Sequence, residues 1–279
     1  MTALPTRRDR ITVLGVLNTT PDSFSDGGLH AGVDAAVEHG LRLWREGADI
    51  VDVGGESTRP GAQRVDEDEE RRRVLPVIAG LAAEGVVVSV DTYRAAVAEA
   101  ALAAGASIVN DVSGGLADPA MLPVVRAAGC PWILMHWRGH ADRMAEHAVY
   151  DDVVADVRAE LLTRVDAVLA AGVAQSQLVI DPGLGFAKTA THNWALLAQL
   201  SALVELGLPV LIAASRKSFL GRLLVDSEGD PRPVDDLEDA TTAITVHCAA
   251  AGVWGVRVHD VRPSVDAALV AAAIRDARP

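Results

Sequence analysis

The sequence predicts a single (β/α)8 (TIM) barrel with the active site at the C-terminal ends of its strands. Short β-branched runs alternate with longer helical patterns along the 279 residues, as in a parallel sheet whose strands are joined by helices. The run at 209–214 (PVLIAA) is apolar on both faces, which is typical of parallel strands covered on both sides. The length suits one barrel of ~250 residues. A doubly wound open sheet is the alternative, and it is disfavoured because no GxGxxG turn follows the first strand.

The elements follow from these patterns in chain order. Strands are expected at residues 11–17, 49–53, 86–90, 107–109, 132–135, 178–180, 209–214 and 255–258. Helices are expected at residues 33–46, 66–83, 94–104, 119–128, 152–171, 192–206, 219–224, 237–251 and 264–275. Glycine stands directly after expected helices at positions such as 47, 105, 172 and 207, where it can end a helix in the left-handed conformation. We expect residues 1–10 to form an N-terminal tail and residues 11–279 to form one barrel domain.

Composition and charge exclude several classes of partner. The formal net charge of −13 disfavours nucleic acid and anionic membranes, because both select basic surfaces. No stretch reaches the ~20 apolar residues that a membrane span needs, and no secretory signal is recognised. Cys130 and Cys248 stand in neither a CxxC nor a metal-ligand spacing, so two unpaired thiols and a cytoplasmic location are expected.

Polar and ionisable residues stand at the C-terminal end of nearly every expected strand. Ligands of parallel α/β folds gather at these ends, and an unpaired charge buried there costs several kcal/mol. Lys217 closes the apolar run at 209–214 and is the centre of this group. The strand ends carry Asn18, Glu56, Ser57, Thr58, Arg59, Asp91, Asn110, Met135, His136, Asp181, Ser215, Arg216, Lys217, Arg257 and His259.

Four of these residues suit a flat, nitrogen-rich heterocycle: Asp91, Asn110, Asp181 and Lys217. A carboxylate accepts two parallel N–H bonds from an aminopyrimidine-like edge, an Asn amide both donates and accepts, and a lysine donates to a ring carbonyl or nitrogen. Met135 and Phe186 could pack on the ring faces, although a role in the core is the more common one for a methionine such as Met135.

Arg257 and His259 suit a polyphosphate leaving group. They alternate along one strand, so their side chains face the same way. Asn18 could join them through a divalent cation. Because one Asn oxygen is a weak ligand, Mg²⁺ would be held mainly by phosphate oxygens and water.

These residues stand in motifs that together resemble the dihydropteroate synthases. The resemblance covers the chain from Ile11 onward and follows the family's order of motifs. The matching segments are 17–28 (LNTTPDSFSDGG), 52–61 (DVGGESTRPG), 89–92 (SVDT), 110–115 (NDVSGG), 181–186 (DPGLGF), 215–217 (SRK) and 257–260 (RVHD).

The resemblance implies a folate-synthesis enzyme that joins 7,8-dihydropterin-6-ylmethyl diphosphate to 4-aminobenzoate and releases diphosphate. It implies Mg²⁺ at Asn18 and a sulfonamide-type class of inhibitors. A homodimer formed through outer helices is also implied. The implied sites are pterin at Asp91, Asn110, Met135, Asp181 and Lys217; diphosphate at Asn18, Thr58, Arg59, Arg257 and His259; aminobenzoate at Thr58, Arg59, Pro60, Phe186, Lys217 and Ser218; and a mobile loop at Asp22, Phe24 and Asp26.

Two other functions remain open at this point. A pterin-binding methyltransferase barrel would share the Asp-Asn-Asp pocket but lack sites for diphosphate and aminobenzoate. A catalytically silent paralogue would bind pterin without turnover. The sequence departs from the common family pattern at Thr19 and at residues 136–138 (HWR). We expect little effect from Thr19, and we expect Arg138 to be exposed because arginine usually is.

Overall fold

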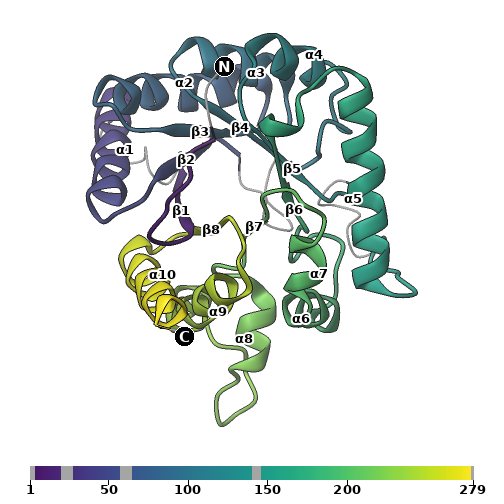
Figure 1. The fold of residues 1–279 in the computed structure, drawn as a ribbon. Coiled ribbons are helices and arrows are strands. Elements are labelled where there is room, and N and C mark those ends of the chain that lie inside the picture. The colour runs from purple at the N-terminus through teal and green to yellow at the C-terminus, as the bar shows by residue number, and fades with distance from the viewer. Residues whose placement is uncertain (1–3, 20–27, 57–64, 140–145, 278–279) are drawn as a thin grey trace.

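A computed structural model describes residues 4–19, 28–56, 65–139 and 146–277. Eight parallel strands within these ranges form one sheet in the order β6-β5-β4-β3-β2-β1-β8-β7 (Figure 1). A bridge between Ile180 and Val210 joins the two outermost strands and closes the circle. The predicted barrel is therefore confirmed. The strands are β1 (Thr12–Asn18), β2 (Ile50–Gly54), β3 (Val88–Asp91), β4 (Ile108–Asp111), β5 (Trp132–Met135), β6 (Leu178–Asp181), β7 (Leu211–Ile212) and β8 (Gly255–Val258).

Helices surround the strands. They are α1 (Gly28–Arg45), α2 (Glu67–Ala83), α3 (Ala95–Ala103), α4 (Met121–Ala128), α5 (Val153–Ala170), α6 (Ala190–Ala198), α7 (Leu200–Val204), α8 (Ser218–Leu223), α9 (Glu238–Ala251) and α10 (Val261–Asp276), with 3₁₀ helices η2 (Gln175–Gln177) and η3 (Val234–Asp236). No helix in the described ranges is long and apolar enough to cross a membrane.

Several element boundaries differ from the expected ones. α1 begins at Gly28 rather than at residue 33. The single helix expected at 192–206 is two helices, because Gln199 has φ −122° and ψ 38° and leaves the helical path. β7 is limited to Leu211–Ile212, since only these two residues of the expected strand pair with β8. α10 begins at Val261 rather than at residue 264.

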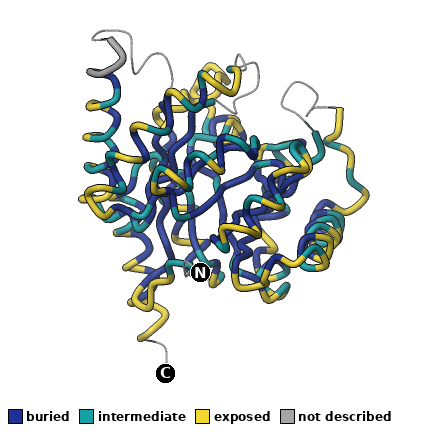
Figure 2. Tube along the Cα trace, turned by 90° about the horizontal axis from the view of Figure 1, so that it is seen from above, coloured by how far each residue is buried: buried dark blue, intermediate teal, exposed yellow. Residues whose placement is uncertain are grey.

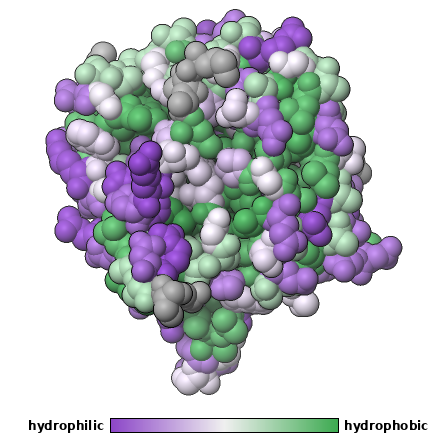
Figure 3. Space-filling view, in the orientation of Figure 1, coloured by the Kyte–Doolittle hydropathy of each residue, from purple (hydrophilic) through white to green (hydrophobic). Residues whose placement is uncertain are grey.

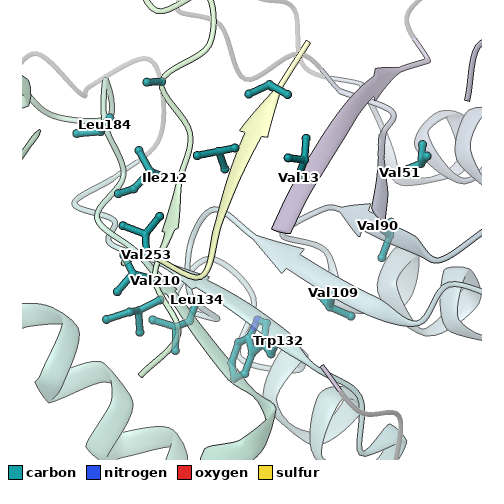
Figure 4. Packing of buried hydrophobic residues seen from close by; sticks show 14 of the residues in the cluster. Val13, Val51, Val90, Val109, Trp132, Leu134, Leu184, Val210, Ile212 and Val253 are labelled. Atoms are coloured by element: carbon teal, nitrogen blue, oxygen red, sulfur yellow. The ribbon is translucent and has the colours of Figure 1, made fainter. Parts of the chain in front are cut away.

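Strand alternation separates two apolar layers. Side chains that point outward pack under the helices, and Figure 4 shows part of this layer, with Val13, Val51 and Val90 on neighbouring strands. Side chains that point inward fill the lower half of the barrel. This inner group consists of Leu14, Ile50, Ile108, Ile133, Val179 and Leu211. Buried residues accordingly concentrate in the middle of the molecule, and exposed residues lie on its outer turns (Figure 2).

The segment before β1 covers the bottom of the barrel. Leu4 packs against the inner apolar group together with Trp254, and Trp254 Nε1 donates a hydrogen bond of 3.0 Å to Pro5 O. Arg10 is buried and donates to Asp49 Oδ1 at 3.0 Å and to Gly47 O at 2.9 Å. The apolar filling below and this cover leave the upper end of the barrel as the place for a site.

Candidate active site

A cavity of about 290 Å³ opens at the C-terminal ends of the strands. In the space-filling view, residues of intermediate hydropathy gather at the centre of this face, among hydrophobic ones (Figure 3). The cavity is lined by Val16, Asn18, Asp91, Asn110, Val112, Met135, Asp181, Gly185, Phe186, Ala213, Ser215, Arg216, Lys217, Ser218, Val234, Arg257 and His259.

Strand register places several of these side chains at one level. Asn18 pairs with Gly54, Gly54 with Asp91, and Asp91 with Asn110. On the other side of the barrel, Met135 pairs with Asp181. Side chains at every second strand position face the same way, so the polar ends meet above the apolar filling.

Four residues of this upper level form a bonded group that we call the floor cluster: Asp52, Asp91, Asn110 and Arg257. Arg257 donates from Nε to Asp52 Oδ2 and from Nη2 to Asp91 Oδ2, both at 2.6 Å. Asn110 Nδ2 donates to the same Asp52 oxygen at 3.0 Å. A carboxylate only accepts hydrogen bonds, so Asn110 turns its NH₂ group toward Asp52.

Burial and mutual charge shift the ionisation of the floor cluster. Burial raises the pKa of Asp91 to about 7, against the opposing effect of Arg257 and with the support of the Asp52 charge. Burial acts to lower the pKa of Arg257, but the carboxylates of Asp52 and Asp91 outweigh it and hold that pKa above its ordinary value. Arg257 therefore stays charged, whereas Asp91 titrates near neutrality.

Asp181 and Lys217 face this cluster from β6 and from the turn after β7. Asp181 Oδ1 accepts the peptide N–H of Gly183 at 2.7 Å, and burial raises the pKa of Asp181. Lys217 Nζ donates to Leu184 O and lies 4.2 Å from the centre of the Phe186 ring. Burial lowers the pKa of Lys217 to about 8, partly offset by Asp181.

The absence of a side chain at Gly185 leaves room for the Lys217 side chain. A Cβ atom at position 185 would stand 2.8 Å from Lys217 Cδ, and its φ of +79° also disfavours other residues. Across the cavity, Ser215 Oγ accepts the peptide N–H of His259 at 3.1 Å and lies 2.9 Å from His259 Nδ1. Both contacts fix the imidazole at the cavity wall.

A second bonded group stands beside the cavity on the loops after β5 and β6 and on α5. We call it the wall cluster: His136, Arg138, Tyr150, Glu160 and Lys188. His136 Nε2 lies 2.9 Å from Glu160 Oε2, and His136 Nδ1 lies 3.0 Å from Lys188 Nζ. The carboxylate only accepts and the lysine donates, so the imidazole carries its proton on Nε2.

The imidazole of the wall cluster is neutral. Burial, followed by the charge of Lys188, lowers the pKa of His136 to about 3 even though Glu160 acts to raise it. Burial likewise lowers the pKa of Lys188 to about 7. Lys188 also donates to Phe186 O at 3.1 Å, which connects the wall cluster to the loop that lines the cavity.

Arg138 is not the exposed residue that was expected. Its guanidinium stands over the Tyr150 ring at 3.8 Å, and its Nε donates to Glu160 Oε2 at 3.0 Å. It also donates to Val149 O. Only 22% of its side chain is exposed. Stacking on an aromatic ring and pairing with a carboxylate stabilise a guanidinium in a partly buried place, which exposure statistics do not capture.

The structure places ten of the expected site residues around the one cavity: Asn18, Asp91, Asn110, Met135, Asp181, Phe186, Lys217, Ser218, Arg257 and His259. Six others lie outside the described residues: Asp22, Phe24, Asp26, Thr58, Arg59 and Pro60. Ser215, expected at a strand end, also lines the cavity, whereas Asp52 was missed as a site residue. Asp52 could have been found, because it alternates with Ile50 and Gly54 on an inward-facing strand; Ser215 stands between the strand and Lys217.

Donors for a metal are sparse. The described ranges contain no group of three His, Cys, Asp or Glu side chains that could hold a metal ion. Asn18 offers one neutral oxygen at the cavity. This donor set fits a hard cation whose other ligands are phosphate oxygens and water, and it does not fit a cation held by the protein alone.

Comparison with known proteins places the cavity in context. The family described as pterin binding enzyme matches residues 14–259. The dihydropteroate synthase of Mycobacterium leprae is 59% identical over 270 residues, which are 96% of this chain and 95% of that protein.

Solved structures agree. The dihydropteroate synthase of Xanthomonas albilineans with 4-aminobenzoic acid superposes with a TM-score of 0.87 at 45% identity, over 97% of this chain and 95% of the other. The Yersinia pestis dihydropteroate synthase with a sulfonamide drug complex superposes with a TM-score of 0.89 at 40% identity, over 99% of this chain and 100% of the other.

Proposed function

We propose how this chain, which belongs to the pterin-binding enzymes and within them to the dihydropteroate synthases, uses its cavity. The reaction condenses 7,8-dihydropterin-6-ylmethyl diphosphate with 4-aminobenzoate and releases diphosphate, and it makes the chain a transferase of folate biosynthesis. The observation that carries the residue assignment is the cavity itself. It joins acceptors and donors for a heterocycle to cationic groups for a leaving diphosphate.

The pterin ring binds at the floor of the cavity in this proposal. Asp181 and Asp91 accept the N–H groups of the ring, and Lys217 donates to its carbonyl or nitrogen atoms. Asn110 presents its amide oxygen to the ring, because its NH₂ group is turned to Asp52. Met135 packs on one face of the ring.

The diphosphate leaves toward Asn18, Arg257 and His259. The N–H donors of the guanidinium and the imidazole stabilise the negative charge that grows on the departing oxygens. Mg²⁺ bound with the diphosphate and with Asn18 would supply further neutralisation of this charge. The family motif also assigns Thr58 and Arg59 to the diphosphate, and both lie outside the described residues.

Aminobenzoate binds above the pterin, against Phe186, Ser218 and the stem of Lys217. Its amine already has a lone pair for attack, so no side-chain nucleophile is required. The C–O bond to diphosphate breaks, the pterin ring delocalises the positive charge that develops on the methylene carbon, and the amine nitrogen forms the new C–N bond and loses a proton. The carboxylates of Asp91 and Asp181 favour that developing charge.

The order of binding follows from this arrangement. The pterin diphosphate binds first at the floor and builds one surface of the second site. Aminobenzoate follows. The resemblance assigns Thr58, Arg59 and Pro60 to its site and Asp22, Phe24 and Asp26 to a loop beside it, and these six residues lie outside the described ranges. Sulfonamides, which resemble aminobenzoate in shape, compete for the same place.

The experiment that tests the function measures two products together. Purified protein is supplied with both substrates and Mg²⁺, and dihydropteroate and diphosphate are quantified. We expect equal amounts of both, and no dihydropteroate without aminobenzoate. Pterin binding without either product would indicate a silent paralogue. Methyl transfer from a methylated folate without diphosphate release would indicate the methyltransferase alternative.

A homodimer in the cytoplasm is the setting that we propose for this reaction. Val246 on α9 and Val270 and Ile274 on α10 expose between 39% and 58% of their surfaces, which suits a self-association surface. Cys130 and Cys248 are unpaired and buried, as is common in reducing compartments. Light scattering that gave the mass of one chain would contradict the dimer.

A further inference from the structure

The chain contains two lysines, Lys188 and Lys217, beside many arginines. Both donate to backbone carbonyls of one short segment, the loop after β6. Lys217 Nζ donates to Leu184 O, and Lys188 Nζ donates to Phe186 O at 3.1 Å. This loop carries the Phe186 ring to the cavity. Two ammonium groups therefore hold this loop, one from a residue that lines the cavity (Lys217) and one from a residue outside that lining (Lys188).

The contacts of Lys188 continue through His136 to α5. Lys188 Nζ also donates to His136 Nδ1 at 3.0 Å, and His136 Nε2 donates to Glu160 Oε2 at 2.9 Å. Glu160 thus fixes the tautomer in which Nδ1 can accept from the lysine. His136 is itself tied to β6, because its peptide N–H donates to Asp181 O at 2.8 Å. The chain of contacts runs from a helix outside the barrel to the carbonyl of Phe186.

A third donor acts on the next peptide. Tyr150 Oη donates to Ala187 O at 3.1 Å. Ala187 has a φ of +47°, a conformation that residues other than glycine seldom adopt. Such a backbone persists only where the surroundings determine it. The hydrogen bonds from Lys188 and Tyr150 to the consecutive carbonyls of Phe186 and Ala187 stabilise this conformation.

We infer that Lys188 is a positioning residue for the aminobenzoate site: with Tyr150 it fixes the loop that presents Phe186. It does so without touching the substrates. The inference rests on the proposed role of Phe186 beside aminobenzoate. The effect on pterin diphosphate is expected to be smaller, because the hydrogen bonds of Lys188 go to His136 and Phe186 and not to Asp181, Lys217 or the floor cluster. Only the charge of Lys188 acts on Asp181.

The test compares Lys188→Met with Tyr150→Phe. Lys188→Met keeps most of the stem and removes the donors. Tyr150→Phe keeps the ring and the charge of Lys188 and removes only the donor to Ala187. Arg126→Met is the matched control, because Arg126 also donates to a carbonyl, Ala171 O at 3.1 Å, but at an exposed place outside the cavity. For each variant the KM of both substrates, kcat and the affinity for pterin diphosphate are measured.

We expect the aminobenzoate KM to rise about tenfold in Lys188→Met and about threefold in Tyr150→Phe, as for the loss of a single hydrogen bond. The affinity for pterin diphosphate should change less than about twofold in both. Arg126→Met should match wild type in every constant.

Two results would overturn the inference. One is an unchanged aminobenzoate KM in Lys188→Met, even if the melting temperature falls, because the lysine would then serve stability alone. The other is an effect of Lys188→Met without any effect of Tyr150→Phe, which would point to the charge of the lysine rather than to the loop. A wild-type protein that makes no dihydropteroate contradicts the proposed function instead, so the two failures are distinguishable.

Discussion

The floor cluster and the wall cluster both hold charged side chains beside the cavity, but they are built on different structural elements. Both pair carboxylates with cationic side chains next to one cavity. The floor cluster stands on strands, and its central Asp52 is fully buried. The wall cluster is assembled from two loops and one face of α5, and its Glu160 is 40% exposed. Strands fix side chains at one level of a barrel, whereas loops need bonds to one another to hold a shape.

The balance of charge also differs between the two clusters. The floor cluster sets two carboxylates against the one guanidinium of Arg257. The wall cluster sets the carboxylate of Glu160 against Arg138 and Lys188 around a neutral imidazole. The excess of carboxylates suits a pterin carbon that becomes positive when diphosphate leaves. Changes on the floor side should therefore impair pterin chemistry, and changes on the wall side should impair the second substrate.

The largest effect is expected from Asp181→Ala. The variant removes a buried acceptor from the pterin side, and hydrogen bonds to charged groups contribute about 1.5–3 kcal/mol each. Affinity for pterin diphosphate should fall at least ~100-fold, as it should in Lys217→Ala. Titration calorimetry measures the affinity, and circular dichroism checks that the fold is kept. Turnover that survived both substitutions would show that the site residues are assigned wrongly.

Asp52→Asn should have the next largest effect. The substitution removes the negative charge that binds Arg257 Nε and orients Asn110. Asp52 itself does not line the cavity. We expect kcat/KM for pterin diphosphate to fall about tenfold to ~100-fold, since a buried charge pair is broken. The KM of aminobenzoate measured at saturating pterin diphosphate should change little. A larger change in the aminobenzoate KM than in kcat/KM for pterin diphosphate would contradict the assignment of the floor cluster to the pterin side.

The pH dependence should be set by the floor side. Burial raises the pKa of Asp91 to about 7, so protons remove its acceptor as the pH falls through that value. Burial lowers the pKa of Lys217 to about 8, so its charge is lost as the pH rises through that value. We expect kcat/KM for pterin diphosphate to peak between about pH 7 and 8.

The same profile provides a further comparison. The Asp52 charge helps to raise the pKa of Asp91, so the acid limb in Asp52→Asn should move to lower pH. An acid limb that stays in place would show that Asp91 does not govern it. Glu160→Gln, on the wall side, should leave the position of this limb unchanged.

The smallest effect is expected from Glu160→Gln itself. The amide oxygen can still accept from His136 Nε2, and the pair with Arg138 loses only its charge–charge part, which is worth little at a partly exposed place. The aminobenzoate KM should rise no more than about threefold. Steady-state kinetics measures it, and an effect as large as that of Asp52→Asn would contradict the ranking.

The contrast between the clusters also explains what the sequence could predict. Asp91, Asn110, Asp181 and Arg257 line the cavity, and period-two alternation and strand ends place them there without further information. The barrel followed from the same reasoning, since apolar runs and helical patterns alternate through the chain.

The wall cluster could not be predicted in this way. Glu160 stands in the middle of a helix, and only the three-dimensional packing of α5 brings it to His136. Arg138 has no local pattern that distinguishes a stacked guanidinium from an exposed one. The break at Gln199 and the short β7 likewise depend on tertiary contacts rather than on propensity.

One measurement tests the assignment of the cavity most directly: a crystal structure of the protein with pterin diphosphate and Mg²⁺. The account predicts the ring edge within hydrogen-bond distance of Asp91, Asn110, Asp181 and Lys217, with the diphosphate directed toward Asn18, Arg257 and His259. A pterin ring bound elsewhere, or a diphosphate turned away from Arg257 and His259, would contradict it.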